Sequence, residues 1–172
     1  MADPSALIQV ISDHELTFMG KSYRCAVGKK GFAKDKREGD HCSPTGTYSL
    51  RECWYRPDRL EAPHTKLFVR PIFENDGWCD ASGDANYNQH VKLPYDASHE
   101  NLWRDDHVYD VIVPLSYNDD PAEAGKGSAI FMHIARPDFS GTEGCVALTK
   151  EDLLEVLKNA SADTQITILK AD

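Results

Sequence analysis

The sequence predicts a mainly β protein of the α+β class, in which one helix accompanies many short strands. Short runs rich in apolar, β-branched and aromatic residues recur along the 172 residues, each bounded by Pro, Gly, Asn or Asp. Only one segment, residues 150–160, has the apolar spacing of an amphipathic helix. Because 41% of the residues are hydrophobic, the chain can bury a core, and residues 1–172 are predicted to form a single domain.

The first predicted strand is ALIQVIS at residues 6–12. The next stretch, LTFMGKSYRCAVG at 16–28, is typical of a hairpin of two strands that reverses at Gly20 and Lys21. In the last predicted strand of the chain, isoleucines alternate with threonine and glutamine, which indicates one buried face. The remaining strands are predicted from the same composition at residues 45–53, 66–73, 108–115, 128–135 and 164–170.

The predicted helix follows Cys145 closely and has a recognisable start. Thr149 is placed to cap its N-terminus, and Asp152 stands at the reciprocal position of a capping box. The leucines of the helix are spaced to form one apolar stripe. This stripe consists of Leu153, Leu154 and Leu157.

Residues 74–107 lack any regular pattern and are predicted to form a long insertion loop. The segment is rich in Asn, Asp and Gly but also carries four aromatic residues, which favours a packed insertion over disorder. We expect it to lie beside a groove, with a short helix that begins at Ser98. The aromatic residues are Trp78, Tyr87, Tyr95 and Trp103.

Bulk charge and composition exclude several classes of protein. The net charge of -9 argues against a nucleic-acid-binding protein, because such proteins attract phosphate with clustered Lys and Arg. No run approaches the roughly 18 apolar residues of a membrane helix, and no signal peptide is visible after the opening MADPS. The cysteines form no C-x-x-C pair, and whether four of them form disulfides stays open. They are Cys25, Cys42, Cys53, Cys79 and Cys145.

The segment TEGCVAL, residues 142–148, contains a candidate nucleophile. A thiol has an ordinary pKa of about 8.5, so a catalytic cysteine needs a neighbouring base, and His133 lies twelve residues before Cys145. Gly144 permits a sharp turn, after which the N–H groups of Gly144 and Cys145 are expected to face an oxyanion. Thr142 is expected to fix the turn through its hydroxyl and to contribute to substrate binding. The same residues are also consistent with a small core thiol and a structural histidine.

Two separated motifs decide between these interpretations. The segment from His133 to TEGCVAL resembles the H-(x)n-[ST]-x-G-C-[IV] signature of the YkuD-type L,D-transpeptidases. The upstream segment EGDHCSPTGTYSLRE, residues 38–52, is similar to the family's T-P-x-G-x-[FY] strand. The resemblance extends from about residue 16 to 169 and implies a YkuD-like β-sandwich with one helix after the cysteine.

The resemblance also implies an activity. Cys145 would be acylated by a peptidoglycan stem peptide, and the acyl group would pass to an amine of a second stem. His133 would be the general base and acid, with Gly144 and Cys145 as oxyanion donors. No metal or organic cofactor is implied, and carbapenem-type β-lactams are candidate inhibitors. The substrate implies the periplasm.

Two positions depart from the family pattern. Ala147 stands where the family usually has Arg, so Arg136 is a candidate for binding a substrate carboxylate. Glu143 stands where His is common and would place a negative charge near the acceptor amine. A solvated role is also consistent with either side chain. Both changes resemble a short proteobacterial subgroup that is associated with 1,3 crosslinks, from L-Ala to meso-diaminopimelate, rather than 3,3 crosslinks.

Two alternatives and one further cluster remain open at this stage. The same Cys and His pair is consistent with an L,D-carboxypeptidase or endopeptidase, in which water accepts the acyl group. A protein that keeps the fold but only binds peptidoglycan is the other alternative. Glu38, Asp40 and His41 lie close together, but they lack ligand-like spacing, so a polar turn is favoured over a metal site.

Overall fold

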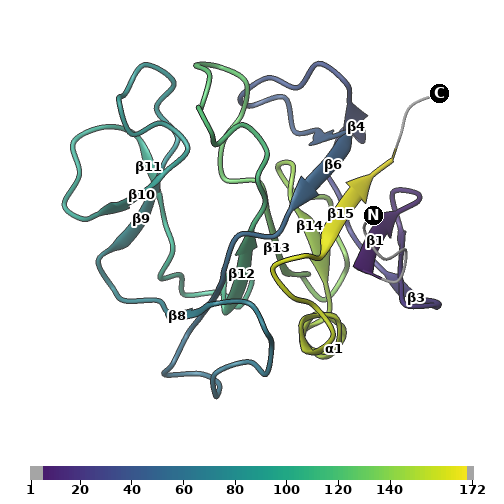
Figure 1. Ribbon diagram of the computed structural model, residues 1–172. Coiled ribbons are helices and arrows are strands. Elements are labelled where there is room, and N and C mark those ends of the chain that lie inside the picture. Colours follow the sequence, from purple (N-terminus) through teal and green to yellow (C-terminus); the bar gives the residue numbers. More distant parts are fainter. Residues whose placement is uncertain (1–5, 170–172) are drawn as a thin grey trace.

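The computed structural model describes residues 6–169, which contain one helix and two five-stranded sheets together with a three-stranded and a two-stranded sheet. The predicted mainly β class is therefore confirmed (Figure 1). In chain order the elements are β1 (Leu7–Val10), β2 (Glu15–Phe18), β3 (Lys21–Arg24), β4 (Phe32–Ala33), β5 (Ser43–Pro44), β6 (Gly46–Ser49), β7 (Cys53–Tyr55), β8 (Val69–Pro71), β9 (Asp76–Cys79), β10 (His90–Lys92), β11 (His99–Asn101), β12 (Val111–Pro114), β13 (Phe131–Ile134), β14 (Val146–Leu148), α1 (Lys150–Lys158) and β15 (Gln165–Ile168).

One five-stranded sheet joins the two ends of the described chain. Its order is β3-β2-β1-β15-β6, and β1 pairs with β15 in parallel. The predicted hairpin is present, but it turns one residue earlier than expected, at Met19 and Gly20. Lys21 already belongs to β3 because it pairs with Phe18 across the ladder. The predicted terminal strand is confirmed as β15, with both isoleucines fully buried.

The second five-stranded sheet, ordered β14-β13-β12-β7-β8, carries different side chains on its two faces. Successive residues of a strand point to opposite faces, so Met132 and His133 of β13 face opposite ways. We call the side of Met132 the aliphatic face and the side of His133 the aromatic face. The register pairs Met132 with Val146 and His133 with Ala147, which extends both faces onto β14.

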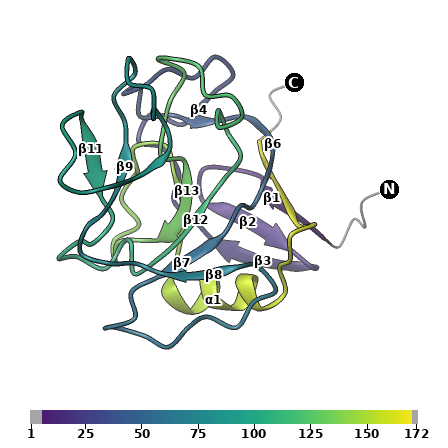
Figure 2. The ribbon, with the colours of Figure 1, turned by 60° about the vertical axis from the view of Figure 1, so that its left-hand side comes forward.

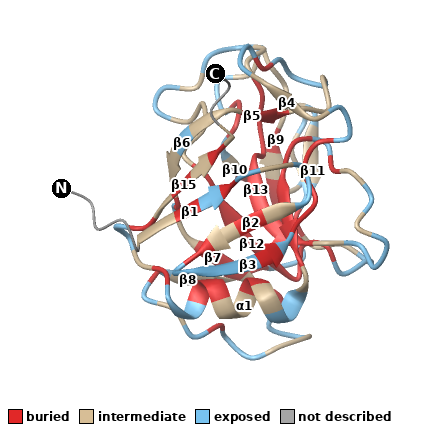
Figure 3. Ribbon diagram, turned by 90° about the vertical axis from the view of Figure 1, so that its right-hand side faces the viewer, coloured by how far each residue is buried: buried red, intermediate tan, exposed pale blue. Residues whose placement is uncertain are grey.

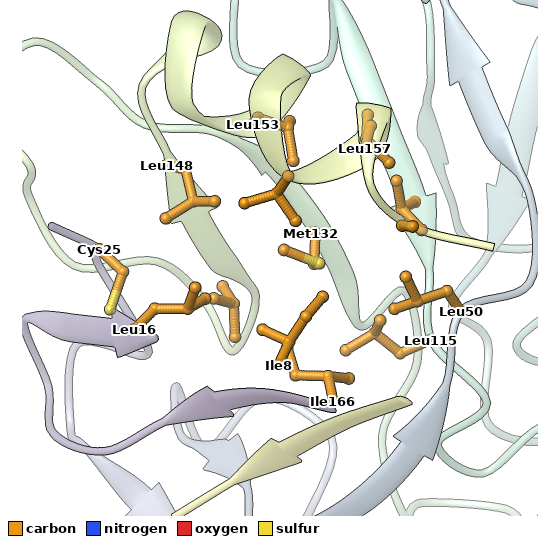
Figure 4. Close-up of a cluster of buried hydrophobic side chains, with 14 of the residues drawn as sticks. Ile8, Leu16, Cys25, Leu50, Leu115, Met132, Leu148, Leu153, Leu157 and Ile166 are labelled. Carbon is orange, nitrogen blue, oxygen red and sulfur yellow. The ribbon is translucent and has the colours of Figure 1, made fainter. Parts of the chain in front are cut away.

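The aliphatic face packs against the first sheet and α1. In Figure 4, Met132 and Leu148 of the second sheet meet Ile8 and Ile166 of the first, under the leucines of the helix. Figure 2 shows α1 lying along the lower edge of the sheets. Figure 3 shows this interior as buried residues surrounded by exposed loops. Apolar burial of about 25 cal/mol per Å² is the main stabilising contribution in such a core.

The helix begins as predicted, because the Thr149 hydroxyl accepts a hydrogen bond from the Asp152 N–H at 3.1 Å. Its buried stripe differs by one residue from the predicted one. Leu153, Val156 and Leu157 are buried, whereas Leu154 is half-buried. Positions separated by three and four residues share a helix face, which brings Val156 rather than Leu154 inward.

The segment 74–107 is more ordered than predicted, because it forms a sheet of its own in the order β10-β9-β11. Figure 1 places these strands on the opposite side of the molecule from β1 and β15. The helix predicted to begin at Ser98 is wrong, since β11 starts at His99 and pairs with β9. Trp78 of β9 packs edge-on against Phe131 at 5.0 Å between ring centroids, which attaches the insertion to the aromatic face.

Candidate active site

Cys145 and His133 lie on the same face of two neighbouring strands. The parallel register of β13 and β14 pairs Met132 with Val146, which places Cys145 opposite Phe131. Phe131 and His133 are separated by two residues, so their side chains and that of Cys145 all belong to the aromatic face. Cys145 and His133 also line one cavity of about 230 Å³. The sequence motif is thereby brought together in space.

A tight turn positions Cys145 before β14. The Thr142 hydroxyl donates to the Cys145 carbonyl at 2.7 Å and accepts from the Gly144 N–H at 3.1 Å, in agreement with the predicted turn. Gly144 has φ of +145°, and a Cβ there would lie 2.9 Å from the Cys42 carbonyl oxygen. Only glycine meets both conditions without strain.

This turn corrects the expectation that two N–H groups face the oxyanion. The Gly144 N–H is engaged by Thr142, so it does not point freely at a substrate in this conformation. Within residues 6–169 the Cys145 N–H has no hydrogen-bond acceptor. It is therefore the backbone donor that remains available for an oxyanion beside the nucleophile.

The thiol of Cys145 is neutral in the structure. Its Sγ donates to the Ala129 carbonyl oxygen at 3.2 Å and accepts from the Phe131 N–H at 3.4 Å. Only 6% of the residue is exposed, and burial raises the pKa of the thiol to about 12. A base must therefore remove the proton during the attack on a substrate.

His133 has the tautomer and charge that such a base requires. The Ile134 carbonyl oxygen can only accept, so Nδ1 of the ring carries the proton and donates to it at 2.9 Å. Nε2 is left with a lone pair. Burial lowers the pKa of His133 to about 4, which keeps the imidazole neutral near pH 7.

The sulfur and the imidazole share no hydrogen bond in the described residues, since Sγ is turned toward Ala129. The two side chains nevertheless lie on one face, because Cys145 is opposite Phe131 and His133 is two residues further along the neighbouring strand. Rotation about the Cα–Cβ bond of Cys145 moves the sulfur over this face. Proton transfer to His133 therefore requires the sulfur to leave its hydrogen bond with the Ala129 carbonyl oxygen.

Charged groups of both signs surround the pair. Arg136 and Glu143, predicted to bind substrate, are exposed residues that line the cavity. The insertion adds Glu100, whose carboxylate accepts a hydrogen bond from the Tyr109 hydroxyl at 2.8 Å. Burial raises the pKa of Glu100 to about 7. The Tyr109 ring in turn packs edge-on to His133 at 5.5 Å.

Sequence reasoning missed Glu100, Tyr109 and a third cavity residue, Lys36. Glu100 and Tyr109 stand in or beside the segment that has no periodicity, where no local signal distinguishes them. Lys36 belongs to the charged run KDKREGD, which is typical of a solvated loop. Their proximity to Cys145 arises from the tertiary fold alone.

The polar cluster before β5 serves the loop structure. Glu38 accepts hydrogen bonds from Tyr87 and Ser128 at 2.7 and 2.6 Å, and Asp40 pairs with Lys36 at 2.7 Å. No group of three His, Cys, Asp or Glu side chains within residues 6–169 is arranged to hold a metal. All five cysteines, which lie in the same range, are free thiols.

Comparison with known protein families identifies the fold. The model of the L,D-transpeptidase catalytic domain, YkuD, matches residues 5–168. The chain belongs to this family. The YkuD match includes His133 of β13 and Cys145 directly before β14, and it confirms the resemblance found in the sequence. A search of the curated proteins finds no match.

Solved structures similar to this YkuD domain include L,D-transpeptidases. The Bdellovibrio bacteriovorus protein Bd1075 has a TM-score of 0.49 at 16% identity, covering 95% of this chain and 47% of its own. L,D-transpeptidase 1 of Mycobacterium tuberculosis has a TM-score of 0.44 at 11% identity, covering 96% of this chain and 60% of its own. L,D-transpeptidase 3 of the same organism, in complex with a faropenem-derived adduct, has a TM-score of 0.46 at 12% identity, covering 95% of this chain and 60% of its own.

The chain thus spans about half to three-fifths of the length of these solved proteins. Its mostly β architecture with one short helix accompanies the match to the YkuD family model. Among residues 6–169 there is no helix with the length and apolar character needed to cross a membrane.

Proposed function

We propose that this YkuD domain is an L,D-transpeptidase that crosslinks peptidoglycan stem peptides through a thioester on Cys145. One observation carries the proposal: Cys145 and a neutral His133 line the same cavity from one face of adjacent strands. The Cys145 N–H beside them has no acceptor in the described residues. A nucleophile, a base and an oxyanion donor are the groups that acyl transfer requires.

The first half-reaction forms the thioester. Nε2 of His133 takes the thiol proton while Sγ attacks the donor carbonyl carbon, and the carbonyl electron pair moves onto oxygen. The Cys145 N–H stabilises this oxyanion. When the intermediate collapses, the C–N bond breaks, and His133 returns its proton to the leaving amine.

The second half-reaction transfers the acyl group to another stem. An acceptor amine attacks the thioester carbon and loses a proton to His133. The C–S bond then breaks, and the departing thiolate recovers the proton from the imidazole. The new amide bond joins the two stems, and the enzyme is unchanged.

The cavity wall has side chains of both charges, which favours a substrate that carries a carboxylate and an amine. We assign Arg136 to a substrate carboxylate and Glu143 to the acceptor amine side, and Thr142 holds the turn between them. Asp80 Oδ1 and His41 Nδ1 are buried in this wall without partners in the described residues, so a polar substrate would satisfy them.

The proposal includes a crosslink type and a location. We propose the 1,3 linkage, from L-Ala of the donor to meso-diaminopimelate of the acceptor, because Ala147 and Glu143 replace the usual family residues. Ala147 lies opposite His133 in the ladder, so the replaced position adjoins the proposed base. Since peptidoglycan lies outside the inner membrane, the proposed location is the periplasm.

Incubation of the purified protein with muropeptides, followed by mass spectrometry, tests this function. We expect dimers whose fragmentation places the new bond between L-Ala and meso-diaminopimelate. Cys145→Ala and Cys145→Ser should abolish them, whereas the matched variant Cys42→Ser, which removes a half-buried thiol, should retain them. Dimers formed by Cys145→Ala would contradict the proposal, and shortened monomers without dimers would identify a hydrolase instead.

A further inference from the structure

Lys36 is a buried cation in an otherwise exposed loop. Only 4% of the residue is accessible, whereas Lys34, Asp35 and Arg37 beside it are exposed. Lysine is rarely buried without a specific partner, because transfer of the ammonium from water is costly. The burial of Lys36 therefore calls for an explanation in terms of what its ammonium contacts.

Two glycines make room for the side chain. A Cβ placed on Gly127 would lie 2.9 Å from Lys36 Cε, and a Cβ on Gly144 would lie 3.3 Å from Lys36 Nζ. Both glycines have positive φ, +119° and +145°, which disfavours other residues there. The ammonium thus lies against the backbone of Gly144, directly before Cys145.

The ammonium retains hydrogen-bonding capacity toward the cavity. It donates to Asp40 Oδ1 at 2.7 Å and makes a long contact of 3.5 Å with the Arg37 carbonyl oxygen. A lysine ammonium has three N–H groups, so at least one is free for a further acceptor. Asp40 is itself held by the N–H groups of Arg37 and Cys42, which fixes the position of the pair.

We propose that Lys36 is a catalytic residue of the proposed acyl transfer, where its ammonium and the Cys145 N–H together stabilise the oxyanion. The inference rests on the proposed function. The Lys36 ammonium would replace the second oxyanion donor, because the Gly144 N–H already donates to the Thr142 hydroxyl. Lys36 lines the cavity with Cys145, and its charge lowers the pKa of that thiol against the larger effect of burial.

Two reagents separate this role from a general effect on the thiol. A carbapenem acylates Cys145 through an oxyanion, in a step that breaks the lactam C–N bond. Iodoacetamide alkylates the same sulfur by displacing iodide, and no oxyanion forms. In Lys36→Met we expect the acylation rate to fall about 10²-fold or more, as for loss of one oxyanion donor. Alkylation of Cys145 should fall less than tenfold.

Intact-mass kinetics and peptide mapping of the full chain measure both rates. Lys34→Met, an exposed lysine of the same loop that does not line the cavity, is the matched control and should acylate at the parent rate. Equal losses of acylation and alkylation in Lys36→Met, or no loss of acylation, would overturn the assignment. A parent protein that forms no adduct would contradict the proposed function itself, and the role of Lys36 with it.

A second variant tests whether a loss of acylation comes only from a loss of stability. Lys36→Met leaves the Asp40 carboxylate without its cation, so its melting temperature is expected to fall. Lys36→Met/Asp40→Asn removes both charges and should recover the melting temperature without recovering acylation. Recovery of acylation in this double variant would show that Lys36 acts only through folding.

Discussion

The two faces of the β14-β13-β12-β7-β8 sheet differ in the chemistry that they bury. The aliphatic face meets a core in which alkyl side chains predominate, and burial raises the pKa values of the Cys25 and Cys53 thiols there to about 12. The aromatic face meets a second cluster that contains Trp54, Tyr109 and Phe131 around Cys145. Both faces come from the same strands, so alternation along each strand separates them.

Burial alone does not distinguish a reactive thiol from an inert one. The pKa of Cys145 is raised to about 12, as are those of Cys25 and Cys53. The thiols differ in their surroundings. Cys145 lines a cavity together with His133 and Lys36. Substitutions on the aliphatic face should therefore mainly lower the free energy of unfolding. Substitutions on the aromatic face should mainly lower the rate at which Cys145 is acylated.

The largest expected effect is the loss of His133, the proposed base on the aromatic face. His133→Gln should lower the carbapenem acylation rate on the order of 10³-fold, equivalent to about 4 kcal/mol of transition-state free energy. The reason is that His133, whose ring is neutral and has a lone pair on Nε2, shares the face of Cys145 and lines the same cavity. Intact-mass kinetics measure the rate, and His64→Gln, an exposed histidine, is the matched control.

The same substitution has a stability signature at acid pH. The pKa of His133 in the folded protein, about 4, is below its ordinary value of 6.5, so the unfolded chain binds more protons between these values. Stability from the neutral ring is present above pH 6.5 and is lost as pH falls through 4, by up to roughly 3 kcal/mol. His133→Gln should lose less stability over this interval in urea titrations.

The acylation prediction has its own contradicting outcome. If His133→Gln were acylated at the parent rate, His133 would not be the base of the reaction.

The neighbouring residue on the opposite face should show the reverse behaviour. Met132 is fully buried among alkyl groups, and Met132→Ala should lower the free energy of unfolding by about 3 kcal/mol through the cavity it leaves. Acylation by a carbapenem well below the melting temperature should stay within threefold of the parent rate. Denaturant titration and intact-mass kinetics measure the two quantities.

The matched control for this change is Met132→Leu, which conserves volume and should cost less than about 1.5 kcal/mol. If Met132→Ala lost acylation while keeping its stability, the separation between the two faces would be wrong. If both substitutions were equally destabilising, the effect would not be one of packing.

Local signals in the sequence were sufficient for part of this architecture. The cap at Thr149 and the alternation in β15 depend on neighbouring residues, so sequence reasoning predicted them correctly. The insertion strands are short and polar, and they depend on distant contacts. Asn88, for example, accepts hydrogen bonds from Trp78 Nε1 and the Ala129 N–H, which joins β9 to the segment directly before β13. No window of sequence contains both partners.

The candidate site shows the same division. His133 and Cys145 are twelve residues apart and belong to one motif, so their proximity was predictable. Lys36 reaches Gly144 across more than a hundred residues, and the engagement of the Gly144 N–H depends on the rotamer of Thr142. These features follow from packing, which the pattern of residues does not encode locally.

The smallest expected effect concerns Glu100, a residue of the insertion that accepts a hydrogen bond from Tyr109 of the aromatic cluster. Partial burial of its carboxyl group lowers the stability of the folded protein when the group is ionised. The pKa of Glu100 in the folded protein, about 7, is above its ordinary value of 4.5, so the folded state binds more protons between these values. Stability is therefore highest below pH 4.5 and is lost as pH rises through 7. Glu100→Gln removes this titration and keeps an acceptor for the Tyr109 hydroxyl.

We expect Glu100→Gln to stabilise the protein by about 1.5 kcal/mol at pH 8 and to change stability little at pH 4.5, after allowance for the partial exposure of the residue. Urea titrations at the two pH values measure the difference, and Glu61→Gln, an exposed carboxyl, should show no such dependence. Equal destabilisation at both pH values would mean that Glu100 contributes through its hydrogen bond alone. In that case the aromatic face would resemble the aliphatic face in having no titrating carboxyl group near neutral pH.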